Sequence, residues 1–159
     1  IRDRDVTGVQ TCALPISMLK DLITKDRINI VQNVDSWQDA IKLASKPLLD
    51  DNSITQSYVD AMIESVNTHG PYIVLDDYFA LPHASPSAGV NKLAMSLLVV
   101  REDVDLVGKP TNVFLVLSAV DTTTHLDALA NLSDVLCERK NIEIFRKGNP
   151  DDILKLINN

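Results

Sequence analysis

Apolar residues recur at helical spacing in a stretch near the N-terminal third of the chain. Asp35 and Ser36 stand in front of this stretch as potential N-caps, with Asp39 placed to complement the helix start. Pro47 is predicted to end or kink the helix, because proline cannot donate the backbone hydrogen bond that a helix interior needs. The residues that share one helical face are Trp37, Ala40, Ile41, Ala44 and Leu48.

A second helix is predicted directly afterwards. Thr55 stands at its start as a cap, and the helix is expected to stop at His69-Gly70-Pro71. Gly70 can adopt the left-handed conformation of a helix terminator, and Pro71 blocks continuation. The apolar face of this helix is formed by Val59, Met62, Ile63 and Val66.

The middle of the chain reads as strands. Residues 72–75 and 79–81 are short apolar runs, whereas 93–100 and 113–119 are longer and apolar on both faces. Continuous apolar runs of this kind are typical of central strands that are covered on each side. Residues 105–110 are rich in turn formers and are interpreted as a connector.

Two more helices complete the pattern. The third is predicted to begin near Thr123 or Thr124, and the fourth has Asn149 as cap and Pro150 at its first position. Helices alternating with strands indicate one α/β domain with helices packed on a central sheet. Residues 1–17 show neither periodicity and are expected to be a non-native or disordered tail, so the predicted domain covers residues 18–159.

Composition narrows the possible partners. The net charge of −7 argues against nucleic acid or an anionic membrane and suits a partner with a basic face. Cys12 and Cys137 form no metal spacing and no disulfide framework, and no apolar run is long enough to span a bilayer. A cytoplasmic protein is therefore expected. Cys137 is predicted to lie in the core on the third helix.

The three histidines are the candidate chemical groups. His83 follows a predicted strand and opens a loop. This position is compatible with a reactive imidazole and also with an ordinary hydrogen-bonded surface residue. His125 lies near the start of the third helix beside Thr123 and Thr124, whose hydroxyls and free N–H groups could cradle an anion. The residues alone favour plain helix caps there. His69 is interpreted as a helix-end residue that meets the helix dipole.

Two segments carry a resemblance to a known family. Residues 70–90, GPYIVLDDYFALPHASPSAGV, resemble the active-site segment of mannitol/fructose-type IIA domains of the bacterial sugar phosphotransferase system (PTS). The nearest likeness is the ascorbate-type branch, whose members show G-P-Y-x-[IV], A-[ML]-P-H and P-x-x-G-V. Residues 119–136, AVDTTTHLDALANLSDVL, resemble the second block of that branch. The likeness extends over the chain apart from the tail.

The resemblance implies a fold and a set of roles. The fold would be a central mixed β-sheet flanked by helices. The protein would be a phosphotransferase relay component that takes a phosphoryl group from the phosphocarrier HPr onto His83. It would pass the group to a cysteine of a IIB component, and so indirectly serve a membrane IIC component for ascorbate or a related sugar. His125 would lie beside the phosphorylated ring. Phosphoryl transfer mainly requires positioning and charge stabilisation, so no metal or cofactor is expected.

The chain departs from the branch at two places. An arginine commonly stands two positions after the motif histidine, where this chain has Ser85, which can donate only one hydrogen bond to phosphate. Asp76-Asp77 introduces acidic groups that would repel a phosphoryl group unless they point away. Ser85, Thr123 and Thr124 are the predicted phosphate-binding residues.

Two other functions are compatible with the same residues. One is a regulatory IIA-like phosphoprotein that signals instead of feeding a transporter. The other is a non-catalytic binding module that has kept the fold, against which the presence of both His83 and His125 counts. Neighbouring genes for a IIB and a IIC component would favour the transport role.

Overall fold

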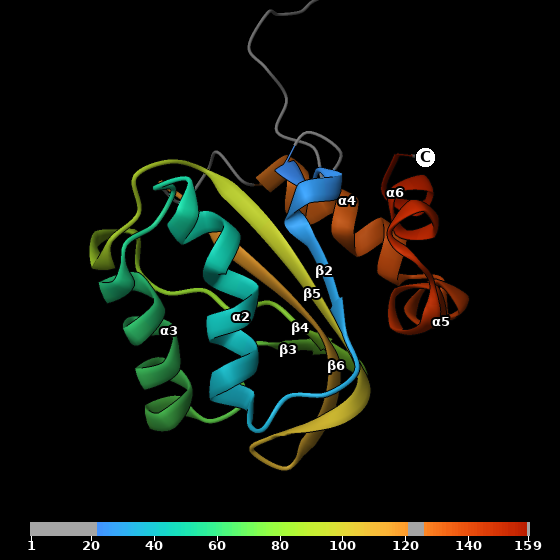
Figure 1. The fold of residues 1–159 in the computed structure, drawn as a ribbon, viewed down its shortest axis with the longest axis horizontal. Coiled ribbons are helices and arrows are strands. Elements are labelled where there is room, and N and C mark those ends of the chain that lie inside the picture. The colour runs from blue at the N-terminus through green and yellow to red at the C-terminus, as the bar shows by residue number, and fades with distance from the viewer. Residues whose placement is uncertain (1–21, 121–125, 159) are drawn as a thin grey trace, which may run out of the picture.

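The computed structural model describes residues 22–120 and 126–158. It contains one five-stranded sheet and five α-helices (Figure 1). In chain order the elements are η1 (Lys25–Arg27), β2 (Ile28–Val31), α2 (Trp37–Asp50), α3 (Gln56–His69), β3 (Val74–Asp76), β4 (Tyr78–Ala80), η2 (Pro86–Ala88), β5 (Ala94–Leu106), β6 (Lys109–Ser118), α4 (Leu126–Leu136), α5 (Arg139–Lys147) and α6 (Pro150–Asn158).

The sheet is mixed, with the strand order β2-β5-β6-β4-β3. β5 and β6 form a long antiparallel hairpin at its centre, and β2 pairs with β5 in parallel. On the other side β4 pairs with β6 in parallel, and β3 closes that edge antiparallel to β4. Because β4 and β6 run in the same direction, their carboxyl ends lie at the same edge of the sheet.

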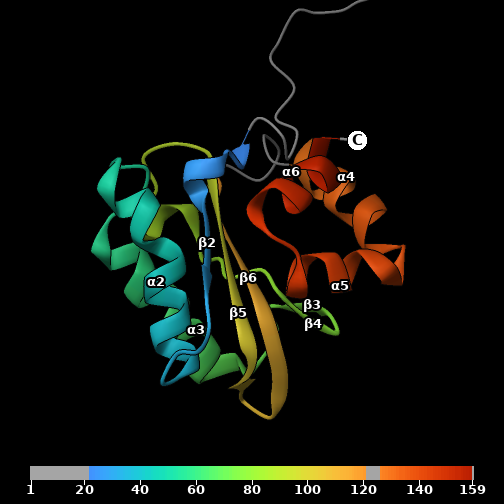
Figure 2. The same ribbon diagram turned by 45° about the vertical axis from the view of Figure 1, so that its right-hand side comes forward.

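The two central strands bury both of their faces, as their sequences predict. On β5, Met95, Leu97 and Val99 pack towards α4, α5 and α6, whereas Leu98 and Val100 pack towards α2 and α3. The alternation follows from the two-residue period of a strand. Figure 2 shows the result: α2 and α3 cover one face of the sheet, and α4, α5 and α6 cover the other.

Three predicted helix boundaries are confirmed. Ser36 is the N-cap of α2, and its hydroxyl accepts a hydrogen bond from the N–H of Asp39 at 3.2 Å. Gly70 ends α3 with φ of 81°, a conformation that side-chain-bearing residues rarely adopt. The side-chain oxygen of Asn149 accepts from the N–H of Asp152 at 2.8 Å, which caps α6.

Pro47 was predicted to end or kink α2. The prediction that it ends the helix is wrong, because the helix continues to Asp50. One further turn is stabilised by burial, because Leu48 is completely inaccessible. The carbonyl of Leu48 also accepts from the N–H groups of Ser53 and Ile54 at 2.9 and 3.3 Å. These contacts offset the hydrogen bond that the proline cannot donate.

The region predicted as a connector, residues 105–110, is instead part of the central hairpin. Asp105 pairs with Pro110 and Leu106 with Lys109, so only Val107 and Gly108 form the turn. Both turn residues have positive φ, 48° and 91°, as a tight two-residue hairpin turn requires.

Helix α5 was not among the predicted helices.

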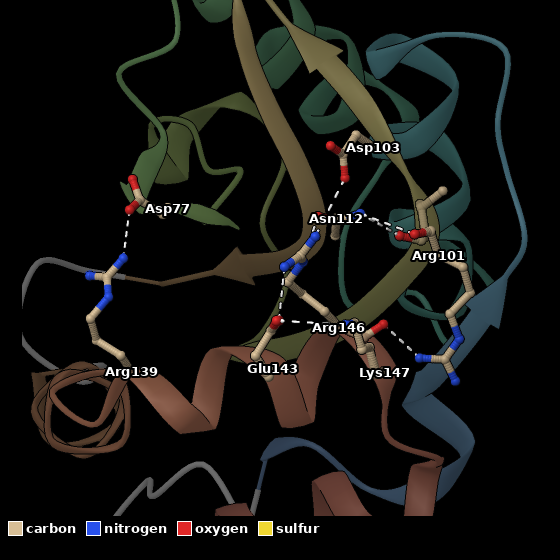
Figure 3. A network of polar contacts seen from close by, with 9 residues as sticks. Asp77, Arg101, Asp103, Asn112, Arg139, Glu143, Arg146 and Lys147 are labelled. Carbon is tan, nitrogen blue, oxygen red and sulfur yellow. Dashed lines mark hydrogen bonds and ion pairs between the residues drawn. The ribbon is translucent and has the colours of Figure 1, made fainter.

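Helix α5 is held to the sheet by a polar network (Figure 3). The Nε of Arg146 donates to the side-chain oxygen of the buried Asn112 at 2.9 Å, and its guanidinium also reaches Glu143 at 2.8 Å. The same guanidinium lies 3.9 Å from the centroid of the Tyr78 ring. Arg101 adds hydrogen bonds to the carbonyls of Arg146 and Gly148.

In the described ranges no helix has the length and hydropathy needed to cross a bilayer.

Candidate functional site

His83 lies three residues after the end of β4, on a backbone held from both sides. The N–H of Leu81 donates to the carbonyl of Ile73 at 2.7 Å. The N–H of Leu117, near the end of β6, donates to the carbonyl of Pro82 at 3.1 Å. Pro82 is buried and its φ is fixed by its ring. The chain that presents the histidine is therefore an extension of the sheet rather than a free loop.

The His83 imidazole is partly buried and has one defined partner. Its Nδ1 lies 2.7 Å from the carbonyl oxygen of Leu81. A carbonyl oxygen can only accept, so in the neutral ring Nδ1 carries the proton and Nε2 keeps its lone pair. A ring nitrogen with a free lone pair is the form in which an imidazole can act as a nucleophile.

Two tyrosine hydroxyls hold the peptide group that follows the histidine. The hydroxyl of Tyr72 donates to the carbonyl oxygen of His83 at 3.2 Å. On the other side of the same peptide group, the N–H of Ala84 donates to the hydroxyl oxygen of Tyr58 at 3.1 Å. The Tyr58 hydroxyl in turn donates to the carbonyl of Leu117 at 2.7 Å. We call Tyr58 and Tyr72 the tyrosine pair.

The two members of the tyrosine pair differ in environment. Tyr58 is 1% exposed, and burial raises the pKa of its hydroxyl to about 12. It therefore stays protonated at neutral pH and can donate and accept at once. Tyr72 is 43% exposed, and its ring meets the His83 ring edge-on, with centroids 5.5 Å apart. On the other side its centroid lies 6.1 Å from that of His69.

Sequence reasoning did not find the tyrosine pair. Tyr58 belongs to the buried face of α3, and Tyr72 lies in the G-P-Y motif. His69 lies in the last turn of α3, as predicted. It is exposed, and among the described residues its contact with the site is the one with Tyr72. The signal that could have found Tyr58 is its position four residues before Met62, on the face that turns towards the sheet.

The loop after His83 rests on the start of α3. The hydroxyl of Ser57 donates to the carbonyl of Ala88 at 2.7 Å, and the N–H of Thr55 donates to that of Gly89 at 3.0 Å. Gly89 has φ of 141°, and a Cβ there would lie 2.1 Å from the Thr55 hydroxyl. Ser85, which was predicted to bind phosphate, is exposed on this loop, and its hydroxyl lies 3.0 Å from that of Ser87.

The other predicted site residues, His125, Thr123 and Thr124, lie outside the described residues.

The chain matches, over residues 21–159, the family described as "Phosphoenolpyruvate-dependent sugar phosphotransferase system, EIIA 2". The chain belongs to this family. The resemblance noted in the sequence is thereby confirmed.

Individual members agree with this assignment. The mannitol-specific cryptic phosphotransferase enzyme IIA component of Escherichia coli K12 is 35% identical over 127 residues, covering 79% of this chain and 86% of the relative. The solution structure of that E. coli component superposes with a TM-score of 0.80 over 87% of this chain and 97% of the other. The ascorbate-specific PTS system EIIA component of Shigella boydii is 26% identical, covering 87% and 94%.

A third likeness concerns the fold alone. In a complex with phosphorylated enzyme IIB, the mannitol enzyme IIA of E. coli superposes with a TM-score of 0.75 at 19% identity. The match covers 86% of this chain and 99% of that one. These neighbours confirm the predicted α/β fold with a mixed sheet and flanking helices.

The two acidic residues of the motif region of this EIIA domain lie away from its histidine. Asp76 and Asp77 lie at the β3–β4 turn, at the opposite end of β4 from His83. Arg139 on α5 lies within ion-pair distance of both, at 3.7 and 2.6 Å (Figure 3 shows the Asp77 pair). These contacts raise the pKa of the guanidinium, chiefly through its hydrogen bond to Asp77. The segment 78–90 contains no Asp, Glu, Lys or Arg.

An apolar groove of about 420 Å³ lies beside the histidine segment of the EIIA domain. Cys137 is exposed at this groove, so the prediction that it lies in the core is wrong. The reason is that α4 ends at Leu136, which leaves Cys137 in the turn after the helix. The groove is lined by Leu75, Asp76, Leu81, Leu129, Leu132, Ser133, Leu136 and Cys137.

Proposed function

We propose that this EIIA domain is a phosphoryl carrier that accepts a phosphoryl group on Nε2 of His83 from phosphorylated HPr and passes it to a IIB cysteine. The observation that carries the proposal is the 2.7 Å contact between Nδ1 and the Leu81 carbonyl. It fixes the proton on one ring nitrogen and leaves the lone pair on the other. It also orients the ring, because the acceptor lies two residues back on the same strand extension.

The proposed transfer needs no co-reactant beyond the two partners. The Nε2 lone pair of His83 attacks phosphorus, the bond from phosphorus to HPr breaks, and the electrons of that bond leave with HPr. The imidazole becomes positive as the N–P bond forms, and the Leu81 carbonyl stabilises that charge through Nδ1–H. In the second step a IIB thiolate attacks phosphorus, the N–P bond breaks, and neutral His83 is regenerated.

We propose His125, Thr123 and Thr124 as the groups that stabilise the phosphoryl charge, with Ser85 as a further donor. The support is topological for the first three. β6 runs parallel to β4 and ends at Ser118, and Leu117 already contacts the histidine segment through Pro82. The chain therefore leaves β6 at the edge of the sheet where His83 lies. Ser85 is supported by its exposure two residues after His83.

The partners follow from the relay role and from charge. A net charge of −7 suits HPr and IIB surfaces that are basic. The apolar groove beside Leu81 offers surface that a docked partner could bury, close to His83. A related IIA domain has been solved with phosphorylated IIB. We propose a cytoplasmic location, a IIC component as the indirect destination, and ascorbate or a related sugar as substrate, supported by the ascorbate-type motifs.

The direct test is incubation with phosphoenolpyruvate, enzyme I and HPr, followed by intact-mass measurement. One phosphoryl group should appear, and it should be lost in acid and survive base, as an N–P bond does. His83→Ala should carry no label. The matched control His69→Ala should be labelled normally, because His69 is exposed and, in the part of the chain that the structure describes, touches the site through Tyr72 alone. Label that persists in His83→Ala would overturn the proposal.

The relay arm uses the phosphorylated protein and purified IIB. Wild-type protein should lose its label to a IIB cysteine. His125→Ala should still accept phosphate but pass it on roughly 100-fold more slowly, the usual cost of losing one charge-stabilising donor. A phosphorylated protein that never labels IIB would instead indicate a signalling role.

A further inference from the structure

We propose that Tyr72 is a positioning residue for phosphoryl transfer, acting through the peptide group between His83 and Ala84; this inference rests on the proposed role of His83. The tyrosine could equally be an ordinary exposed aromatic in a docking surface, since it is 43% exposed. Its contacts favour the positioning role. The hydroxyl reaches the backbone of the histidine itself, and the ring meets the imidazole.

The geometry limits how the imidazole can turn. Two of its neighbours are fixed: the Leu81 carbonyl at Nδ1, and the Tyr72 ring, with the two ring planes at 77°. The backbone that carries the imidazole is fixed by the tyrosine pair, with Tyr72 at the carbonyl and Tyr58 at the N–H of one peptide group. A rotation of that peptide group would break both hydrogen bonds and release the backbone that carries the imidazole.

The two members of the tyrosine pair have different roles. Tyr58 is completely buried and joins α3 to both the His83 loop and the end of β6, so it also supports the fold. Tyr72 lies at the surface and its hydroxyl bonds to the His83 carbonyl, so its loss should affect the ring orientation far more than the fold. This difference makes the role of Tyr72 separable by experiment.

The chain offers a matched control among its three tyrosines. Tyr78 stands at the other end of β4, with its ring beneath the Arg146 guanidinium at 3.9 Å. The three variants Tyr72→Phe, Tyr58→Phe and Tyr78→Phe each remove one oxygen and keep the ring. Only the first two remove a hydrogen bond to the peptide group after His83.

The experiment measures the rate of phosphorylation by phospho-HPr over a range of its concentrations, together with the ¹⁵N chemical shifts of the His83 ring. For Tyr72→Phe we expect the maximal rate to fall about tenfold to 100-fold, because a small misplacement of a reacting group slows the reaction by about that factor. The half-saturating HPr concentration should stay the same. The ring nitrogens should show a smaller share of the Nδ1–H form, and the melting temperature should stay close to that of wild type. Tyr78→Phe should behave as wild type.

Several results would overturn the inference. One is a Tyr72→Phe protein with the wild-type maximal rate and unchanged ring nitrogens. Another is a raised half-saturating concentration with an unchanged maximal rate, which would assign Tyr72 to docking. Failure of the proposed function looks different, because wild-type protein would then remain unlabelled or His83→Ala would be labelled.

Discussion

The two ends of β4 are fixed in contrasting ways. At its beginning, charged side chains make the contacts: Arg139 pairs with Asp77, and Arg146 lies over the ring of Tyr78. Beyond its end, at His83, neutral hydroxyl groups bond to the backbone. One three-residue strand thus separates a region of fixed charge from the His83 segment, whose residues 79–90 include no Asp, Glu, Lys or Arg.

The difference fits the chemistry proposed for His83. A phosphoryl group brings nearly two negative charges, which arrive and leave in each cycle. A fixed arginine or aspartate a few ångström away would favour one state strongly, because Coulomb energies at that distance reach several kcal/mol near a protein surface. Hydroxyl groups hold the backbone equally well in both states. Fixed charge is used where the contact is permanent.

The largest effect on stability should come from Arg146→Met at the charged end. The change leaves the buried side-chain oxygen of Asn112 without its partner and removes the contact with Tyr78. We expect a loss of about 2–4 kcal/mol in the free energy of unfolding, measured by urea titration. The rate of phosphorylation at low temperature should stay at the wild-type value. Lys147→Met is the control, since that side chain is 73% exposed on the same helix. Slower phosphorylation in Arg146→Met would show that the two ends are coupled.

Tyr58→Phe should affect both stability and transfer. The partly buried N–H of Ala84 and the buried carbonyl of Leu117 each lose a partner, which should cost about 1–3 kcal/mol of unfolding free energy. Phosphorylation should also slow, because the His83–Ala84 peptide group is released. Urea titration and the HPr assay measure the two effects on the same preparation. Loss of stability with an unchanged rate would limit Tyr58 to a structural role.

The contribution of Tyr58 should also depend on pH, with a definite sign. An unfolded tyrosine ionises near pH 10, whereas burial raises the pKa of Tyr58 to about 12. Between these values the unfolded chain releases the proton and the folded chain keeps it, so stability is fully present below about pH 10 and is lost as the pH rises towards 12. The stability difference between wild type and Tyr58→Phe should therefore shrink as the pH rises from about 10 towards 12. Parallel curves for the two proteins would contradict the assignment.

Arg139→Ala should have the smallest effect. Its guanidinium and the Asp77 carboxylate are 70% and 68% exposed, so water and salt screen their attraction. We expect urea unfolding curves that match wild type, in contrast to those of Arg146→Met. A loss as large as that of Arg146→Met would mean that exposure does not distinguish these two arginines.

Much of the fold could be predicted because local chemistry and tertiary packing agree. The strands 93–100 and 113–119 are apolar throughout and are buried on both faces, and Gly70 and Asn149 act as the residue types predict. Prediction failed where packing overrode a local preference. Pro47 stays inside α2 because Leu48 is buried, and the β5–β6 hairpin extends through polar residues that only its pairing orders.

The candidate site could be predicted only in part. His83 was identified by a motif and by its place after a strand, and the structure adds the orientation of its ring. Tyr58 and Tyr72 could not be identified because they lie 25 and 11 residues earlier in the chain, and only the packing of α3 and of β3 brings them to the histidine. One lies within a predicted helix and the other at the start of a predicted strand, yet both bond to the backbone of the site.

The strand order also sets when the protein can assemble during synthesis. β2 and β4 are made early, but each has the β5–β6 hairpin as its parallel neighbour, and the hairpin lies between them. Translation must therefore pass β5 before β2 can dock, and it must reach Ser118 before β4 can dock. Until then, the apolar faces of α2 and α3 have no sheet to cover, and the Pro82 carbonyl has no Leu117 N–H to bond. A nascent chain halted before Ala94 should thus be a substrate for chaperones, with its histidine made but not yet presented.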